Sequence, residues 1–151
     1  MTPFTTCLWY DTEAEEAANF YCGIFKDSSI GNVQRLPEGQ VIVVDFTLNG
    51  QHFMGLNGGP QHKFTEAVSF VVHCADQAEV DYYWDALLAD GGRPDACGWL
   101  KDKYGLSWQV VPDRLLELMQ DPERGQAVFQ AMMQMVKLDI APLEEAASSG
   151  G

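Results

Sequence analysis

The sequence predicts an α+β protein built from two copies of a module of one strand, one helix and three further strands, with helices alone at the end. Three patterns indicate this fold: a strand and helix start that return at constant spacing, paired strands after each helix, and a final stretch with only helical periodicity. The modules are expected at about 3–58 and 66–112, and the C-terminal helices at about 113–143. The 151 residues fit one domain over 1–151.

The first module begins with Phe4 to Tyr10, where residues of high β propensity predict a strand. Thr12 and Glu15 have the spacing of a capping box, in which side-chain oxygens accept hydrogen bonds from the free N–H groups at a helix start. Apolar residues at helical spacing continue to about Lys26. The strands that follow are expected at Gly31 to Arg35, Val41 to Leu48 and Gln51 to Leu56, with a tight hairpin turn at Asn49-Gly50.

The second module repeats this order. Ala67 to Cys74 is a predicted strand, and Asp76 begins a helix that the glycines at 91 and 92 end. Thr12 and Asp76 lie 64 residues apart, and the same spacing separates Ile24 from Leu88. Because the starts and the ends of the two predicted helices are separated by the same number of residues, the sequence indicates a duplicated unit. Its later strands are expected at Gly98 to Lys103 and Leu106 to Val111, joined through Tyr104-Gly105.

Past Pro112 the pattern is only helical. Asp113 to Gln120 and Pro122 to Lys137 are predicted helices, the second with proline in its first turn. The stretch from Glu144 to Gly151 is expected to be frayed. The apolar face of the second helix consists of Val128, Phe129, Met132, Met133 and Val136.

Charge and composition exclude two classes of partner. Nine basic residues against 22 acidic ones give a net charge of −13, which opposes binding to nucleic acid and to anionic membranes. No apolar run approaches the ~18 residues that cross a bilayer. The first residues carry no secretory signal and the four cysteines form no C-x-x-C motif, so a cytoplasmic protein with free thiols is expected.

Strand periodicity predicts which side chains line a cavity, because alternate side chains point to opposite faces. In Ala67 to Cys74 one face is fully apolar and should carry the helix, whereas Ser69 and His73 lie on a mixed face. Gln109 falls on the matching face, where its amide needs a neighbouring side chain or a wet cavity, since an unpaired one costs about 1–3 kcal/mol. The candidate ligand-binding residues are Thr5, Cys7, Trp9, His52, Ser69, His73, Trp99 and Gln109.

Some of these residues remain open between two interpretations. His52 and His73 are either acid–base groups or metal ligands, or they are structural. Cys97 is a nucleophile if a base activates it, and otherwise a small buried side chain. Lys101 and Asp102 are expected to form a solvated surface pair.

Four stretches carry a family resemblance: Gly50 to Met54, Val80 to Trp84, Cys97 to Gln109, and Met135 to Ile140. They resemble the PhnB-like branch of the vicinal oxygen chelate superfamily, which holds glyoxalases, ring-cleaving dioxygenases and antibiotic-resistance proteins. Members of the branch often carry the description 3-demethylubiquinone-9 3-methyltransferase. The resemblance covers nearly the whole chain and implies a glyoxalase/bleomycin-resistance/dioxygenase-like sheet and a homodimer.

In metal-using members of that superfamily, His, Glu or Gln residues of the first, fourth, fifth and eighth strands hold the metal. The residues at those positions here are Thr5, Met54 or His52, Ala67 or Ser69, and Gln109. Hydroxyl, thioether and methyl groups do not supply the ligands that a catalytic divalent metal needs, so no metal and no other cofactor is expected. Methyl transfer is not expected either, because Gly55 to Gly59 is the only Gly-rich stretch after a strand and is predicted to be a loop.

The leading hypothesis is metal-independent binding or conversion of a small molecule in the cavity between the two modules. One alternative is a metal-dependent lyase, isomerase or dioxygenase of the superfamily. Another is a dimeric structural module without catalysis.

Overall fold

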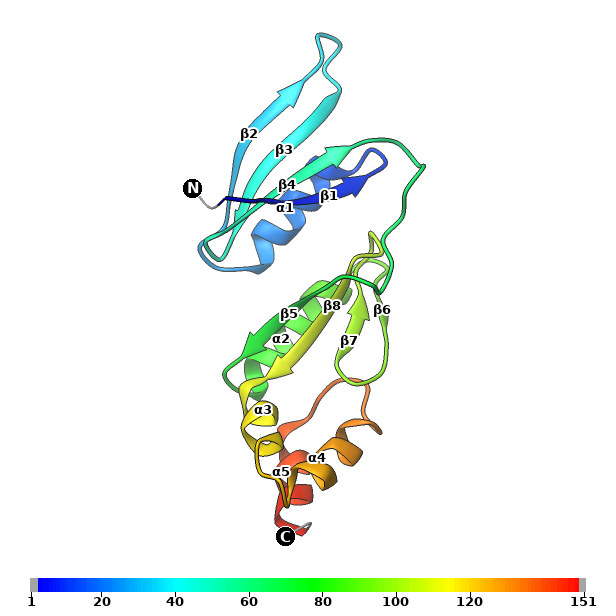
Figure 1. The fold of residues 1–151 in the computed structure, drawn as a ribbon. Coiled ribbons are helices and arrows are strands. Elements are labelled where there is room, and N and C mark those ends of the chain that lie inside the picture. The colour runs from blue at the N-terminus through cyan, green and yellow to red at the C-terminus, as the bar shows by residue number, and fades with distance from the viewer. Residues whose placement is uncertain (1–2, 150–151) are drawn as a thin grey trace. The chain divides into compact units, whose positions relative to one another are not determined.

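Two four-stranded sheets dominate the computed structural model, which describes residues 3–149 (Figure 1). The chain divides into two units, Met1–Phe64 and Thr65–Gly151, and each unit holds one sheet. The strand orders are β1-β4-β3-β2 and β5-β8-β7-β6. In both sheets the first strand pairs in parallel with the last, and the remaining pairs are antiparallel. The predicted α+β fold with two β-α-β-β-β modules is therefore confirmed.

In the first unit, α1 covers one face of the sheet. The small residues of α1 allow the helix to lie close to the sheet. A Cβ added to Gly55 on β4 would lie 3.1 Å from the Cβ of Ala14 on α1. The predicted hairpin turn is confirmed, since Asn49 and Gly50 have φ angles of 51° and 81°. The elements are β1 (Thr6–Tyr10), α1 (Ala14–Ile24), β2 (Ser29–Arg35), β3 (Val41–Leu48) and β4 (Gln51–Asn57).

The start of α1 differs from the prediction. The residue before the helix is Glu13, and no side chain of the predicted capping box bonds to the helix start. Instead, Asn57 at the end of β4 accepts a hydrogen bond from the Ala14 N–H (2.9 Å) and donates one to the Val41 carbonyl (3.1 Å). The capping-box prediction at Thr12 is therefore wrong, and a side chain 43 residues after Ala14 in the sequence caps the first turn of α1 instead.

In the second unit the local capping signal works as predicted. Asp76 Oδ1 accepts from the Glu79 N–H (2.9 Å), and the Glu79 carboxylate accepts from the Ala75 N–H (2.6 Å). The elements are β5 (Ser69–Cys74), α2 (Gln77–Leu88), β6 (Arg93–Pro94), β7 (Trp99–Lys101), β8 (Ser107–Pro112), α3 (Asp113–Met119), α4 (Gly125–Met132) and α5 (Ile140–Ser149).

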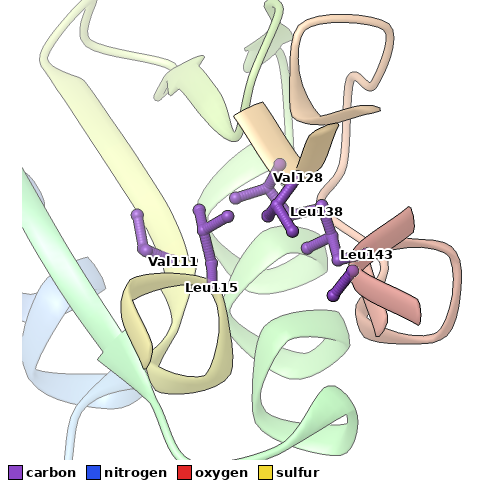
Figure 2. Packing of buried hydrophobic residues seen from close by; sticks show 6 residues of the cluster. Val111, Leu115, Val128, Leu138 and Leu143 are labelled. Carbon is purple, nitrogen blue, oxygen red and sulfur yellow. The ribbon is translucent and has the colours of Figure 1, made fainter. Parts of the chain in front are cut away.

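The C-terminal helices pack around their own apolar cluster. Figure 2 shows Val111 at the end of β8 close to side chains of α3, α4 and the segment before α5; the cluster consists of Val111, Leu115, Val128, Leu138, Leu143 and Ala147. The expected fraying is wrong over 144–149, because α5 continues to Ser149 and buries Ala147; residues 150 and 151 lie outside the described residues. The expected helix over Pro122 to Lys137 is shorter, and its residues Phe129, Met133 and Val136 are exposed.

No helix in the described part of the chain has the length and apolarity that a bilayer crossing requires.

Candidate functional site: the uncovered face of the first sheet

Each sheet has one face under its helix and one without it. In the first sheet the α1 side holds buried residues, among them Leu8, Val44 and Phe53. Alternation then sends the neighbouring side chains to the other face, which we call the first open face. Its members are Thr5, Cys7, Trp9, Val43, Asp45, Thr47, His52, Met54 and Leu56.

The first open face contains an open hollow of about 630 Å³. Strand register arranges its floor in rows: His52 lies opposite Thr47, and Met54 lies between Cys7 and Asp45 on the neighbouring strands. The lining residues, which define the first hollow, are Thr5, Ser29, Gly31, Asn32, Asp45, Phe46, Thr47, His52, Phe53 and Met54. Two of the predicted site residues, Thr5 and His52, are therefore part of one hollow.

The polar side chains of the first hollow have few partners within the protein. His52 Nδ1 lies 3.4 Å from Thr47 Oγ1, and both belong to the hollow. Asp45 is exposed and forms no ion pair among residues 3–149. Hydroxyl, imidazole and carboxylate groups are thus available to a bound molecule, beside the thioether of Met54.

Trp9 lies on the first open face but does not line the hollow. Its indole N–H donates to the Gly59 carbonyl (2.8 Å), and its ring meets the edge of His62 at a centroid distance of 4.7 Å. A Cβ on Gly58 would lie only 2.4 Å from the Trp9 ring, so the segment after β4 packs directly on the indole. Trp9 therefore anchors that segment.

Cys7 on β1 is exposed on the same face and lies opposite Met54 of β4. Partial burial raises the pKa of its thiol above the usual value. A thiol with a raised pKa is protonated at neutral pH, which does not favour a role as nucleophile.

The remaining predicted site residues lie on the open face of the second sheet. Gln109 Nε2 donates to Ser69 Oγ (3.0 Å), which settles the open question about its amide in favour of a neighbouring side chain. Trp99 lies opposite Gln109 in the β7–β8 register. His73, at the end of β5, has its Nδ1 3.9 Å from Asp113 Oδ1.

Sequence reasoning missed the polar residues that β2 and β3 contribute to the first hollow. Asp45 and Thr47 interrupt an otherwise apolar run, Val-Ile-Val-Val-Asp-Phe-Thr-Leu, and that interruption was the available signal. Ser29 and Asn32 could not be assigned to this face from the sequence. The pairing of β2 with β3 shifts between Ile30 and Val33, and nothing in the sequence indicates that shift.

Two further expectations are corrected or resolved. Asp102 is not solvated but buried: its carboxylate accepts hydrogen bonds from Tyr104 N, Leu106 N and the Trp108 indole. Lys101 pairs with Glu66 instead. Cys97 is half-buried, and its thiol contacts the Met133 thioether at 3.7 Å.

The donor groups do not fit a catalytic divalent metal. In the described part of the chain, no three His, Cys, Asp or Glu residues lie close enough to hold an ion. At the four strand positions, the hydroxyl of Ser69 is hydrogen-bonded to Gln109, and the first sheet offers the hydroxyl of Thr5 with Met54 or His52. Such a set falls short of the three or four N/O ligands of a catalytic site.

Comparison with known families agrees with this fold. Residues 2–111 match the family described as 3-demethylubiquinone-9 3-methyltransferase. The structure of a PhnB protein from Bacillus cereus has 37% sequence identity and a TM-score of 0.68, and the match covers 74% of this chain and 99% of that one. The chain belongs to this PhnB-like family.

More distant structures share the fold of this PhnB-like protein. Protein PA1353 from Pseudomonas aeruginosa has 14% identity and a TM-score of 0.61, with 74% of this chain and 98% of that chain covered. The fosfomycin resistance protein FosX from Listeria monocytogenes, solved with Mn(II) and sulfate, has 15% identity and a TM-score of 0.53, with 73% and 92% covered. No curated protein sequence matches the chain significantly.

Proposed function

We propose that this PhnB-like protein binds a small molecule in the first hollow without a catalytic divalent metal. The observation that carries the proposal is the hollow itself, which is lined by polar side chains without strong internal partners and by the apolar side chains of Phe46, Phe53 and Met54. A volume of about 630 Å³ lies within the range of ordinary ligand sites.

The donor chemistry supports the metal-independent form of this function. The groups in the hollow are one carboxylate, one imidazole, hydroxyls, an amide and a thioether. They suit hydrogen bonding and apolar contact with an organic molecule. Transfer of a methyl group from S-adenosylmethionine is not part of the proposal, since β4 leads into a loop and then into β5, with no helix after the glycines at 55, 58 and 59.

The second open face has a secondary place in the proposal. Its Ser69–Gln109 pair, Trp99 and His73 were predicted to line the same cavity as the residues of the first sheet. That common cavity stays a prediction. Val71 lies beside Gln109 on this face and is 43% exposed, so a substitution there tests whether the face takes part.

A thermal-shift screen of small organic molecules tests the function, run once with EDTA and once with added Mn²⁺ or Zn²⁺. A ligand at 100 times its Kd stabilises the folded state by about 2.7 kcal/mol, which raises Tm clearly. Compounds that raise Tm, the hits of the screen, should still do so in EDTA. They should no longer raise the Tm of a Met54→Arg variant, because the arginine side chain fills the hollow. The matched control is Leu36→Arg, an exposed residue in the β2–β3 turn, which should keep them.

Two results would contradict the proposal. One is a set of hits that requires the added metal, together with about one tightly bound metal ion per chain by elemental analysis. The other is a set of hits that Met54→Arg leaves unchanged. Val71→Arg then reports separately whether the second open face contributes.

We also propose a homodimer in the cytoplasm. Exposed apolar side chains on α3, on α4 and just after it support an interface between copies; they are Leu116, Met119, Phe129, Met133 and Val136. All four cysteines are free thiols, as in a reducing compartment. Light scattering of the purified protein checks the dimer, and Phe129→Glu with Met133→Glu should convert it to a monomer.

A further inference from the structure

The charge in the first hollow has one sign. Of its lining residues, Asp45 is the single Asp or Glu, none is Lys or Arg, and His52 is the other titratable one. The protein around it carries a net charge of −13. The electric field of the protein attracts cations and repels anions. An anionic ligand is therefore repelled both by the net charge of the protein and by the carboxylate in the hollow.

Asp45 forms no ion pair within residues 3–149, in contrast to several other acids. Glu15 pairs with Arg35 at 2.7 Å and Asp81 pairs with Lys137 at 2.8 Å. For Asp45 the structure of residues 3–149 gives no such cation. A carboxylate on a central strand, inside a hollow, is therefore available to an external partner.

The neighbouring strand leaves one side of Asp45 uncovered. A Cβ added to Gly31 on β2 would lie 3.5 Å from the Cβ of Asp45, so any side chain at position 31 would stand directly beside the carboxylate. Glycine at this position keeps the space open. On the other side Met54 supplies an apolar surface, since it lies opposite Asp45 in the β3–β4 register.

The remaining polar groups suit a donor-rich cation. The hydroxyls of Thr5, Ser29 and Thr47 and the amide oxygen of Asn32 line the same hollow. All of them can accept hydrogen bonds, although the hydroxyls and the amide also donate, and an ammonium group has N–H donors and no acceptor. The carboxylate and the surrounding acceptors suit the ammonium group of a ligand, and the neighbouring thioether suits an apolar part attached to that ammonium group.

We propose that the ligand of the first hollow is an organic cation, an amine protonated at neutral pH, whose ammonium group pairs with Asp45 while its apolar part lies on Met54. This inference rests on the proposed function and adds the substrate class. Charge-assisted hydrogen bonds from the ammonium to the carboxylate then supply the discrimination between amines and other molecules of the same shape.

Three probes of one shape test the inference: benzylamine, benzyl alcohol and benzoate. Each is titrated into ¹⁵N-labelled full-length protein, and the amide shifts of β3 and β4 are followed. Benzylamine should bind about fivefold tighter than benzyl alcohol, and benzoate weaker still. The preference should decline with added NaCl, because the ion pair is exposed to solvent.

Asp45→Asn should abolish the preference for benzylamine without unfolding the protein, since Asp45 is exposed and unpaired. The matched control is Glu38→Gln in the β2–β3 turn, which removes the same charge outside the hollow and should keep the preference. Far-UV circular dichroism checks that both variants fold.

The outcomes separate this inference from the proposed function. If benzyl alcohol or benzoate binds in the hollow as tightly as benzylamine, or if Asp45→Asn keeps the preference, the cationic ligand class is wrong while binding in the hollow stands. If no probe shifts the amides that line the hollow, the cationic ligand class is overturned, and the thermal-shift screen decides the proposed function separately.

Discussion

The two sheets have the same topology but use their open faces differently. On the second open face, polar groups are matched within the protein: Gln109 with Ser69, Lys101 with Glu66, and His73 near Asp113. On the first open face, Asp45 has no ion pair among residues 3–149, and the imidazole of His52 lies 3.4 Å from the hydroxyl of another hollow residue, Thr47. The duplicated module explains the common strand order. The side chains on each open face decide whether its polar groups pair within the protein or are available to a ligand.

The hairpins of the two units also differ. In the first unit β2, β3 and β4 have seven to eight residues each, and backbone conformation at Asn49-Gly50 makes the turn. In the second unit β6 and β7 have two and three residues, and a buried carboxylate holds the turn into β8. The second unit thus has a shorter hairpin, in which one buried side chain adds to the backbone hydrogen bonds of the turn.

The largest expected effect follows from that difference. Asp102→Ala removes three hydrogen bonds and leaves the buried donors of Leu106 and Trp108 without this acceptor, so the free energy of unfolding should fall by about 3–5 kcal/mol. Urea denaturation measures it. Asp85→Ala, an exposed position on α2, is the control and should change stability by less than about 0.5 kcal/mol. A similar loss for both variants would show that Asp102 does not hold the turn.

A smaller effect is expected at the start of α1, where the two units use different caps. Asn57→Ala removes the acceptor for the Ala14 N–H and the donor to Val41, and should cost about 1–2 kcal/mol. Thr12→Ala should leave stability within about 0.5 kcal/mol, because no side chain of the local pattern bonds to the helix start. If Thr12→Ala proved the more destabilising of the two, the long-range cap would be wrong and the local capping box right.

The smallest effect at neutral pH concerns the helix-covered face of the second sheet. Burial, and then the nearby acids Glu79, Asp113 and Asp76, raise the pKa of the Cys74 thiol to about 12. The unfolded thiol ionises near its ordinary value of 9.0, so the unfolded state binds fewer protons above that pH. The contribution of Cys74 to stability is complete below about pH 9 and is lost as pH rises towards 12.

Urea denaturation at pH 8 and pH 10 measures this dependence. The wild-type protein should lose more stability over the interval than Cys74→Ala, which lacks the buried thiol. Cys7→Ala, on the first open face, should retain the part of the slope that belongs to Cys74. Equal slopes for wild type and Cys74→Ala would show that the thiol ionises as easily in the folded state as in the unfolded one.

Much of the fold was predictable because its signals are local. The 64-residue spacing, the Asp76 cap and the Asn49-Gly50 turn each depend on a few neighbouring residues, and the structure has the predicted element at each place. The last helix was not predictable in this way. Residues 140–149 are helical since Leu143 and Ala147 reach a cluster assembled from four other segments. Figure 2 shows Leu143 within this cluster.

The candidate site was predictable in part. Thr5 and His52 were both among the candidate ligand-binding residues of the sequence, and both line the first hollow. The sequence did not predict that the carboxylate of Asp45 lies in this hollow. Asp45 enters the hollow because β3 lies between β2 and β4, and the glycine beside it is brought there by the β2 register shift.

The sequence by itself determined the repeated strand–helix order, the faces of the strands and the negative charge of the chain, because periodicity, turn residues and composition are properties of short segments. Tertiary structure decided three other points: that Asn57 caps α1, that Asp102 is buried in a turn, and that Asp45 has no ion pair in the described residues. Each of these depends on which side chains meet across strands, and that pairing is set by packing and register over long sequence distances.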